Sequence, residues 1–216
     1  CFVAKVQANC GKRSWEILKL LKEIPYLSIR INKLTYSEKE FLEFAKRENI
    51  TIMNKVEDIY YISKTVINTP EFVEGKIIIQ DGSSYLAAKT LGAKEGETIL
   101  DACSAPGSKA LVMAQEMKNT GKIIALDIHE HKIELIKENA KKMGITIIAT
   151  ENRDATKIHQ SNEVFDRILV DAPCTGFGVL RKKPEALYNK TQANIDELAV
   201  LQYDVLTSAA KKLKIG

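Results

Sequence analysis

The sequence has no apolar run near the roughly 20 residues that a bilayer-spanning helix requires, and no segment with the pattern of a signal peptide. Its four cysteines, Cys1, Cys10, Cys103 and Cys174, have neither the spacing of a metal site nor the number expected of a disulfide framework. These absences predict a protein of the reducing cytoplasm, with no membrane partner and no bound metal.

What is present is typical of a soluble globular protein. Hydrophobic residues make up 45% of the 216 residues and charged residues 28%. That length accommodates one full domain and a smaller one. The net charge of +4 is mildly basic, which permits a polyanionic partner such as a nucleic acid but does not by itself indicate one.

The first 75 residues read as a small α+β unit. The spacing of apolar residues predicts a helix over 11–24, and alternation predicts a strand over 27–32 with one face buried. Ser37 and Glu40 have the spacing of a capping box and begin a helix that runs to about Asn49. Two short β-like runs follow, at 51–53 and 59–62.

From residue 76 onward strands and helices alternate, which predicts an α/β domain with a parallel sheet over 76–216. The expected strands are 77–80, 98–101, 122–127, 146–149 and 166–171, and the expected helices are 83–91, 108–118, 130–143 and 195–213. Three of these strands end in an acidic residue: Asp101, Asp127 and Asp171.

The stretch Glu97–Lys109 organises the domain. A strand, a turn of small residues and a helix together place backbone N–H groups at the carboxyl edge of a parallel sheet, where open α/β folds bind ligands. The turn lacks the G-x-G-x-x-G fingerprint of a pyrophosphate site. This favours a nucleoside without phosphates, such as S-adenosylmethionine, over NAD.

Two acids are candidates for holding that nucleoside. Asp127 could accept hydrogen bonds from the ribose hydroxyls, although it could also cap the next helix. Asp154 could accept from the adenine amino group, or could simply be a turn residue. Both alternatives remain open.

A second motif, Asp171–Gly176, places a carboxylate, a proline and a thiol just past a strand. Asp171 could accept from the exocyclic amine of a cytosine. Cys174 could act as a nucleophile, or could be a buried small hydrophobic residue. Arg181 and Lys182 add positive charge nearby and could contact phosphates, or could belong to a solvated loop.

Together these motifs resemble a known family. DACSAPGSK (101–109) resembles D-x-C-[AS]-A-P-G-G-K, and DAPCTGFGVLRKKPE (171–185) resembles D-A-P-C-[ST]-G-x-G-x-x-R-[RK]-x-P-[DE]. With IQDGSS (79–84) and SIRIN (28–32), they resemble the Sun (Fmu) family of RNA cytosine-C5 methyltransferases, most of all its bacterial members that act on small-subunit ribosomal RNA. The resemblance covers the chain from about residue 11 onward.

The resemblance implies a Rossmann-like methyltransferase sheet behind an N-terminal RNA-binding extension. It implies methyl transfer from S-adenosylmethionine to cytosine C5 in RNA, with 16S ribosomal RNA as the expected substrate and a monomer as the complete protein. The implied RNA contacts are Arg30, Arg181 and Lys182, and the implied catalytic residues are Cys174, Asp171 and Lys109. The implied cofactor residues are Cys103, Ser104, Ala105, Pro106, Gly107, Ser108, Lys109, Asp127, Asp154 and Asp171.

Three departures from the family pattern matter. Ser108 replaces a glycine, and Phe177 replaces a smaller residue. The family's principal nucleophile is a cysteine of a Thr-Cys pair on a further strand, which would lie beyond Gly216. We therefore expect the sequence to be a C-terminally incomplete, inactive fragment that associates through the strand at 166–171, with Cys174 acting in product release. The alternatives are a silent cofactor- and RNA-binding scaffold, and an enzyme that uses Cys174 as its nucleophile.

Overall fold

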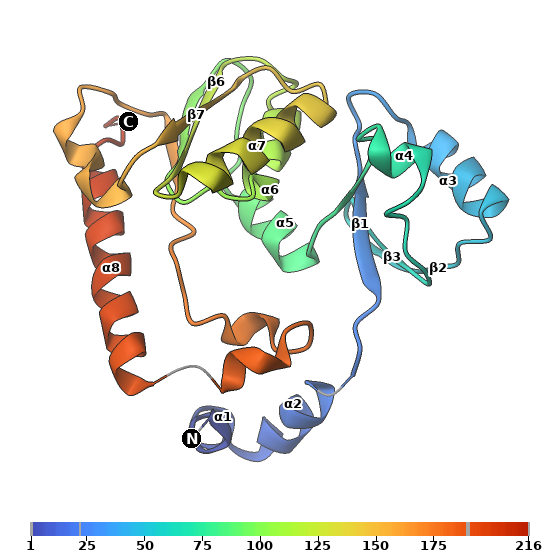
Figure 1. Ribbon diagram of the computed structural model, residues 1–216, viewed down its shortest axis with the longest axis horizontal. Helices are drawn as coiled ribbons and strands as arrows, with labels where there is room; N and C mark the ends of the chain where they lie inside the picture. The colour runs from blue at the N-terminus through green and yellow to red at the C-terminus, as the bar shows by residue number, and fades with distance from the viewer. Residues whose placement is uncertain (1, 22, 189–190, 216) are drawn as a thin grey trace. The chain divides into compact units, whose positions relative to one another are not determined.

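The computed structural model describes residues 2–21, 23–188 and 191–215, so Cys1 and Gly216 lie outside the described residues. The chain forms two compact units (Figure 1). One consists of Cys1–Pro25 with Pro173–Val200, and the other of Tyr26–Ala172 with Leu201–Gly216. Within the described ranges, no helix combines the length and the apolar character needed to cross a membrane.

The larger unit begins with an antiparallel sheet in the order β2-β3-β1-β4. Its strands are β1 (Leu27–Ile31), β2 (Ile52–Val56), β3 (Ile59–Ile62) and β4 (Ile77–Ile79), and its helices are α3 (Glu38–Arg47) and α4 (Pro70–Val73). The predicted capping box is confirmed: Ser37 Oγ accepts from the Glu40 N–H, and the Glu40 carboxylate accepts from the Ser37 N–H.

Strand β1 differs from the prediction of a single buried face. Phe41 and Phe44 of α3 pack with Ile29 on one face, as alternation predicts. Ser28 and Arg30, on the other face, are also buried, at 4% and 3% exposure. Because β1 lies between β3 and β4 and has helices on both sides, its polar residues have no route to solvent.

Strand β4 belongs to the antiparallel sheet and not to the parallel sheet that the sequence predicted from residue 76 onward. Residues 77–80 were expected to start the alternating pattern of the second domain. Instead Ile77 and Ile79 pair antiparallel with Ile31 and Ile29 of β1. The expected boundary after residue 75 therefore precedes the last strand of the first sheet, because a short apolar strand carries no signal of which sheet it will join.

The second sheet is parallel, in the order β7-β6-β5-β8. Its strands are β5 (Thr98–Asp101), β6 (Lys122–Asp127), β7 (Ile148–Asn152) and β8 (Arg167–Leu169). Strands β5 and β6 have the predicted bounds, whereas β7 begins two residues later than expected and β8 is shorter. A parallel bridge between Phe165 and Leu213 extends the pairing beside β8.

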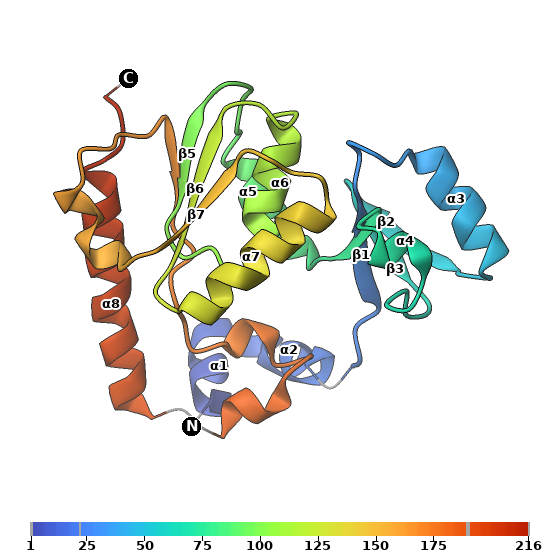
Figure 2. The same ribbon diagram turned by 45° about the horizontal axis from the view of Figure 1, so that its top comes forward.

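Helices cover both faces of this parallel sheet (Figure 2). Ile99 and Ile123 pack toward α5 and α6, while Leu100 and Ile124 pack with Val205 of α8. Strands buried on both faces read as apolar runs, which is why the sequence pattern located them. The helices are α5 (Gly82–Thr90), α6 (Ser108–Glu116), α7 (Glu130–Lys142) and α8 (Gln192–Ala210), with the short helix η2 (Ala155–Gln160).

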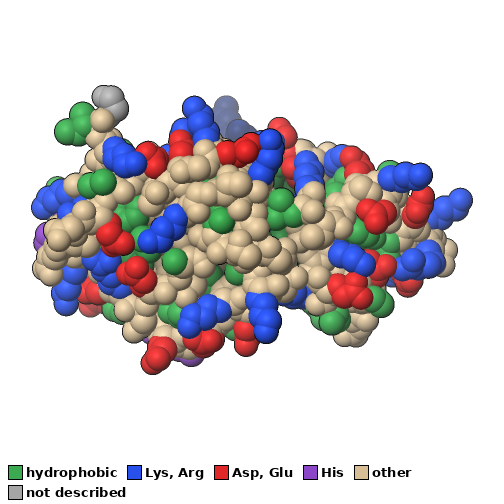
Figure 3. Space-filling model, turned by 90° about the horizontal axis from the view of Figure 1, so that it is seen from above, with side chains coloured by type: hydrophobic (Ala, Val, Ile, Leu, Met, Phe, Trp, Pro, Cys, Tyr) green, Lys and Arg blue, Asp and Glu red, His purple; other side chains and the backbone are tan. Residues whose placement is uncertain are grey.

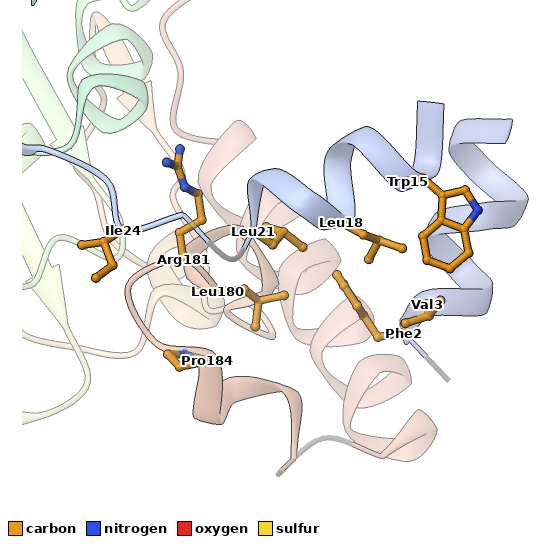
Figure 4. A pocket seen from close by; sticks show the side chains of 9 residues that line it. All are labelled: Phe2, Val3, Trp15, Leu18, Leu21, Ile24, Leu180, Arg181 and Pro184. Carbon is orange, nitrogen blue, oxygen red and sulfur yellow. The ribbon is translucent and has the colours of Figure 1, made fainter. Parts of the chain in front are cut away.

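The smaller unit contains α1 (Phe2–Cys10), η1 (Gly11–Arg13), α2 (Ser14–Leu20), η3 (Phe177–Val179), η4 (Pro184–Leu187) and the start of α8. The sequence did not predict α1, and the helix predicted over 11–24 is longer at both ends than α2. Trp15, Leu18 and Leu21, the predicted apolar stripe, line a cavity of about 670 Å³ together with Leu180 and Arg181 (Figure 4). The stripe therefore faces this cavity, where Trp15 remains 61% exposed.

Candidate functional site

The turn between β5 and α6 is fixed by backbone hydrogen bonds to the strands on both sides of β5. Ser104 N–H donates to the Leu126 carbonyl of β6 at 2.7 Å, and Ala102 N–H donates to the Leu169 carbonyl of β8 at 3.0 Å. Within the turn, Gly107 N–H donates to the Ser104 carbonyl at 2.7 Å. The predicted small-residue turn thus lies at the carboxyl edge of the parallel sheet.

Gly107 precedes α6 and is required there for two reasons. Its φ of +92° lies in the left-handed region that side chains disfavour. A Cβ at this position would also meet Ile136 Cγ2 of α7 at 3.1 Å. This turn can approach α7 closely only because residue 107 lacks a side chain.

Asp127 ends β6 and is 9% exposed. Its Oδ1 accepts from the His129 N–H at 3.0 Å, and Lys132 Nζ lies 3.9 Å away. His129 is the N-cap residue of α7 and makes no side-chain cap, so Asp127 is not the cap of that helix. The helix-capping alternative for Asp127 is therefore wrong.

Asp154 has the local role that the turn interpretation predicted. It caps η2, and its Oδ1 accepts from the Thr156 N–H at 3.0 Å and from Thr156 Oγ1 at 2.7 Å. These hydrogen bonds, with Lys157 nearby, lower the pKa of Asp154. Contact with an adenine remains a prediction for its other oxygen.

Lys109, on the first turn of α6, forms an ion pair with Asp171, which follows β8. The distance from Lys109 Nζ to Asp171 Oδ2 is 2.5 Å, with the lysine side chain 17% exposed and the carboxylate 55% exposed. Two of the three predicted catalytic residues are therefore brought together at the same sheet edge as the turn.

Cys103 is protonated at neutral pH. Burial raises the pKa of its thiol to about 11, and the nearby carboxylates of Asp101, Asp127 and Asp171 add to that rise. A neutral thiol of this kind is a poor nucleophile, which fits a role in lining the turn. Cys174 is exposed and belongs to the smaller unit.

The three predicted RNA-binding residues have different surroundings. Arg30 is 3% exposed, its Nε donates to Gln80 Oε1 at 2.8 Å, and burial lowers its pKa to about 10. It is a buried structural residue, and its predicted RNA contact is not supported, because the alternating pattern suggested an exposure that it does not have. Arg181 donates to the Glu23 carbonyl at 3.2 Å, and Lys182 is exposed.

Asp101 is the functional candidate that sequence reasoning left out of the site. It is 0% exposed, and neither of its carboxylate oxygens makes a hydrogen bond of ordinary geometry with a described residue. Its place at the end of an apolar strand was visible in the sequence, but its burial was not, because Asp171 follows another apolar strand and is exposed.

Figure 3 shows basic and acidic side chains interspersed over the face that it draws. Among the described residues, no group of three or more His, Cys, Asp and Glu side chains is placed to hold a metal ion.

The motifs and the sheet can now be compared with known proteins. The model of the family described as 16S rRNA methyltransferase RsmB/F matches residues 88–216, which include both motifs. The chain belongs to this family. The probable ribosomal RNA small subunit methyltransferase B of Bacillus subtilis is 43% identical over 197 residues, which cover 89% of this chain and 44% of that protein.

Two further similar proteins extend the comparison. The 28S rRNA (cytosine(4447)-C(5))-methyltransferase of Homo sapiens is 38% identical over 151 residues, 70% of this chain and 19% of that protein. The crystal structure of a methyltransferase homologue from Pyrococcus horikoshii is 27% identical, with a TM-score of 0.84, and the match covers 95% of this chain and 67% of that one. The parallel sheet is therefore a Rossmann-like methyltransferase fold. The chain spans less than half the length of these two curated relatives.

Proposed function

We propose that this chain binds S-adenosylmethionine and RNA for methyl transfer to C5 of a cytosine, with small-subunit ribosomal RNA as the substrate. One observation carries the proposal. The turn 102–107 lies at the carboxyl edge of the sheet, beside Asp127 at the end of β6 and the Lys109–Asp171 pair. An RNA substrate of this kind implies action in the cytoplasm, and we propose that the complete protein acts as a monomer.

The residues at this edge fit the cofactor. The small side chains of the turn 102–107 let a ligand approach its backbone closely, and Asp127 offers a carboxylate to the ribose hydroxyls. We assign the cofactor to Cys103, Ser104, Ala105, Pro106, Gly107, Ser108, Lys109, Asp127, Asp154 and Asp171. When bound, S-adenosylmethionine supplies an electrophilic methyl group on a cationic sulfur.

Asp171 and Lys109 are proposed to hold the target base. The Asp171 carboxylate accepts from the cytosine N4 amine, and its ion pair with Lys109 holds that carboxylate in place. A cytosine must be unpaired or flipped out of its helix to reach them. Residues 1–75 are proposed as the RNA-binding extension and 76–216 as the methyltransferase domain, with β4 as the strand that joins the first sheet.

Cys174 is proposed to act after methyl transfer, in release of the product. It lies in the Pro-Cys motif that the family shares, and its exposed thiol is accessible to a substrate. A second candidate role is that of the nucleophile which adds to cytosine C6. A third function, binding cofactor and RNA without turnover, remains an alternative for this chain.

Calorimetry tests the cofactor assignment. Asp127→Ala should weaken S-adenosylmethionine binding by about 1.5–3 kcal/mol, the scale of hydrogen bonds to a charged group. Glu134→Ala removes an exposed acid of α7 that pairs with Lys137, and it should leave the affinity unchanged. Equal affinities for the two variants would refute the ribose role of Asp127.

RNA that contains 5-fluorocytosine tests the chemistry. A C5 fluorine cannot leave as a proton does, so a thiol that has added to C6 stays covalently attached to the RNA. An adduct that disappears in Cys174→Ala would make Cys174 the nucleophile. Cofactor binding without any adduct would support the scaffold function for this chain.

A further inference from the structure

Asp101 is a fully buried carboxyl group with no role in the chemistry proposed above. It ends β5, in register with Ala125 of β6 and Leu169 of β8, at 0% exposure. Neither of its oxygens makes a hydrogen bond of ordinary geometry with a described residue. An unpaired buried carboxylate is costly, so its presence beneath a ligand-binding turn calls for an explanation.

The charged groups around Asp101 do not neutralise it. Lys109 of α6 faces it, but its ammonium lies 2.5 Å from Asp171, which follows β8 and also faces Asp101. On the turn itself, the Ser104 hydroxyl and the Cys103 N–H lie near Asp101 and favour its ionised form, but both are neutral groups. Asp101 therefore has no counter-ion of its own.

The neighbouring strand adds a further negative charge to this turn. The negative charges of Asp127 and Asp101 both raise the pKa of the Cys103 thiol in the turn. The ammonium of Lys132, on α7, lies 3.9 Å from Asp127 Oδ1. Acids from three adjacent strand ends thus surround the turn. The field they create favours a positively charged ligand.

We propose that Asp101 is a positioning residue that senses the charge of the cofactor, so that the site prefers the cationic methyl donor over the product with its uncharged sulfur. The inference rests on the function proposed above. Methyl transfer breaks the bond between sulfur and the methyl carbon and leaves the electron pair on sulfur, so the positive charge disappears. Because Asp101 is buried beneath the turn, it acts through its field rather than by contact.

The charge of Asp101 can be switched within an accessible pH range. Burial raises the pKa of Asp101 to about 6; Ser104 and Lys109 oppose that rise and Asp171 adds to it. The carboxyl is therefore ionised at pH 7.5 and mostly neutral at pH 5. A cation bound above it stabilises the ionised form, so binding should release a proton near pH 6.

Calorimetry at pH 5 and pH 7.5 tests the proposal, with S-adenosylmethionine and S-adenosylhomocysteine as the probes. The preference for the first over the second should rise about tenfold between the two pH values. In Asp101→Asn the preference should change less than twofold, while the exposed-acid control Glu134→Gln should follow the wild type. Using the ratio of the two affinities cancels any general loss of binding in the variant.

The wild-type protein alone provides a second measurement, which does not depend on a variant that folds. Titrations near pH 6 in buffers of different ionisation enthalpy report protons released, which should accompany S-adenosylmethionine but not S-adenosylhomocysteine. A preference that keeps its pH dependence in Asp101→Asn, or equal proton release with both ligands, would overturn the role of Asp101. Absence of binding by either ligand at any pH would instead refute the proposed function.

Discussion

Lys109 and Asp171 are 62 positions apart in the sequence, yet their side chains form an ion pair with 2.5 Å between Nζ and Oδ2. The first belongs to the helix after β5 and the second follows β8, the strand that pairs with β5. The pair therefore joins the two sequence motifs at one edge of the sheet. Its coupling free energy measures how much this contact stabilises that edge.

A double-mutant cycle measures this pair. Lys109→Met and Asp171→Asn should each destabilise the protein, and their combined effect should be smaller than the sum by about 0.5–1 kcal/mol, because the carboxylate is half exposed and screened by solvent. Urea denaturation of the four proteins gives the coupling. A coupling of zero would mean that the ion pair does not hold this edge together.

Gly107→Ala should destabilise the protein by more than a positive φ alone accounts for. A left-handed φ costs a residue with a Cβ about 1–2 kcal/mol, and the new Cβ would also press on Ile136 Cγ2 at 3.1 Å. Gly96→Ala is the matched control, because Gly96 has a φ of +80° and an open space around its Cβ position. If thermal unfolding shows that both variants lose the same amount of stability, α7 does not pack against the turn as described.

Asp101→Asn should stabilise the unliganded protein at pH 7.5 and not at pH 4. The pKa of Asp101 rises from 3.8 in the unfolded chain to about 6 in the folded one, so the folded protein binds the proton more tightly. The stability contributed by this group is present below pH 3.8 and is lost as the pH rises to about 6. The amide of Asn carries no charge and avoids that loss, so the free energy of unfolding at pH 7.5 should rise by up to about 3 kcal/mol.

Asp166 provides a control of opposite sign for that experiment. Its hydrogen bond from Lys214 lowers its pKa, so its ionised form stabilises the folded state above the unfolded pKa. Asp166→Asn should therefore destabilise the protein at pH 7.5 and still do so at pH 4, because pH 4 lies above the unfolded pKa of 3.8. Urea denaturation at both pH values checks the two variants, and changes of the same sign in both would contradict the assignment for Asp101.

RNA affinity should depend on salt and on the basic segment at residues 181–182. Removing one cation that binds a phosphate lowers the magnitude of the slope of log K against log salt by about 0.7 for a single strand. Arg181→Ala and Lys182→Ala should each show that change in a filter-binding titration, whereas the control Lys122→Ala, at the start of β6, should not. An unchanged slope in both variants would mean that this segment is a solvated loop that does not contact phosphates.

Local signals in the sequence predicted β5 and β6 and the capping box at Ser37 correctly, because each depends on residues close together in the chain. Strands buried on both faces leave an uninterrupted apolar run, and a cap depends on a spacing of three residues. The turn at 102–107 was found for the same reason, since its small residues are consecutive.

Errors occurred where the surroundings of a residue come from distant parts of the chain. Arg30 alternates with apolar residues and suggested an exposed face, but Gln80 and helices far along the sequence cover it. The same holds for β4, whose residues pair with residues of β1 that lie 46 to 50 positions earlier. The lack of a counter-ion for Asp101 was equally invisible, because Lys109 pairs with Asp171, which lies 62 positions further along the chain.

The polar links between the two sheets have a consequence for folding cooperativity. Asn32, just after β1, accepts from Gln115 of α6 at 2.6 Å and donates to the Met143 carbonyl at 3.0 Å, while Gln80 donates to the Ser108 carbonyl at 3.3 Å. Opening either sheet would leave these buried groups without partners. The antiparallel and parallel sheets should therefore exchange their amide hydrogens as one foldon, so that β1 and β6 lose protection at the same denaturant concentration.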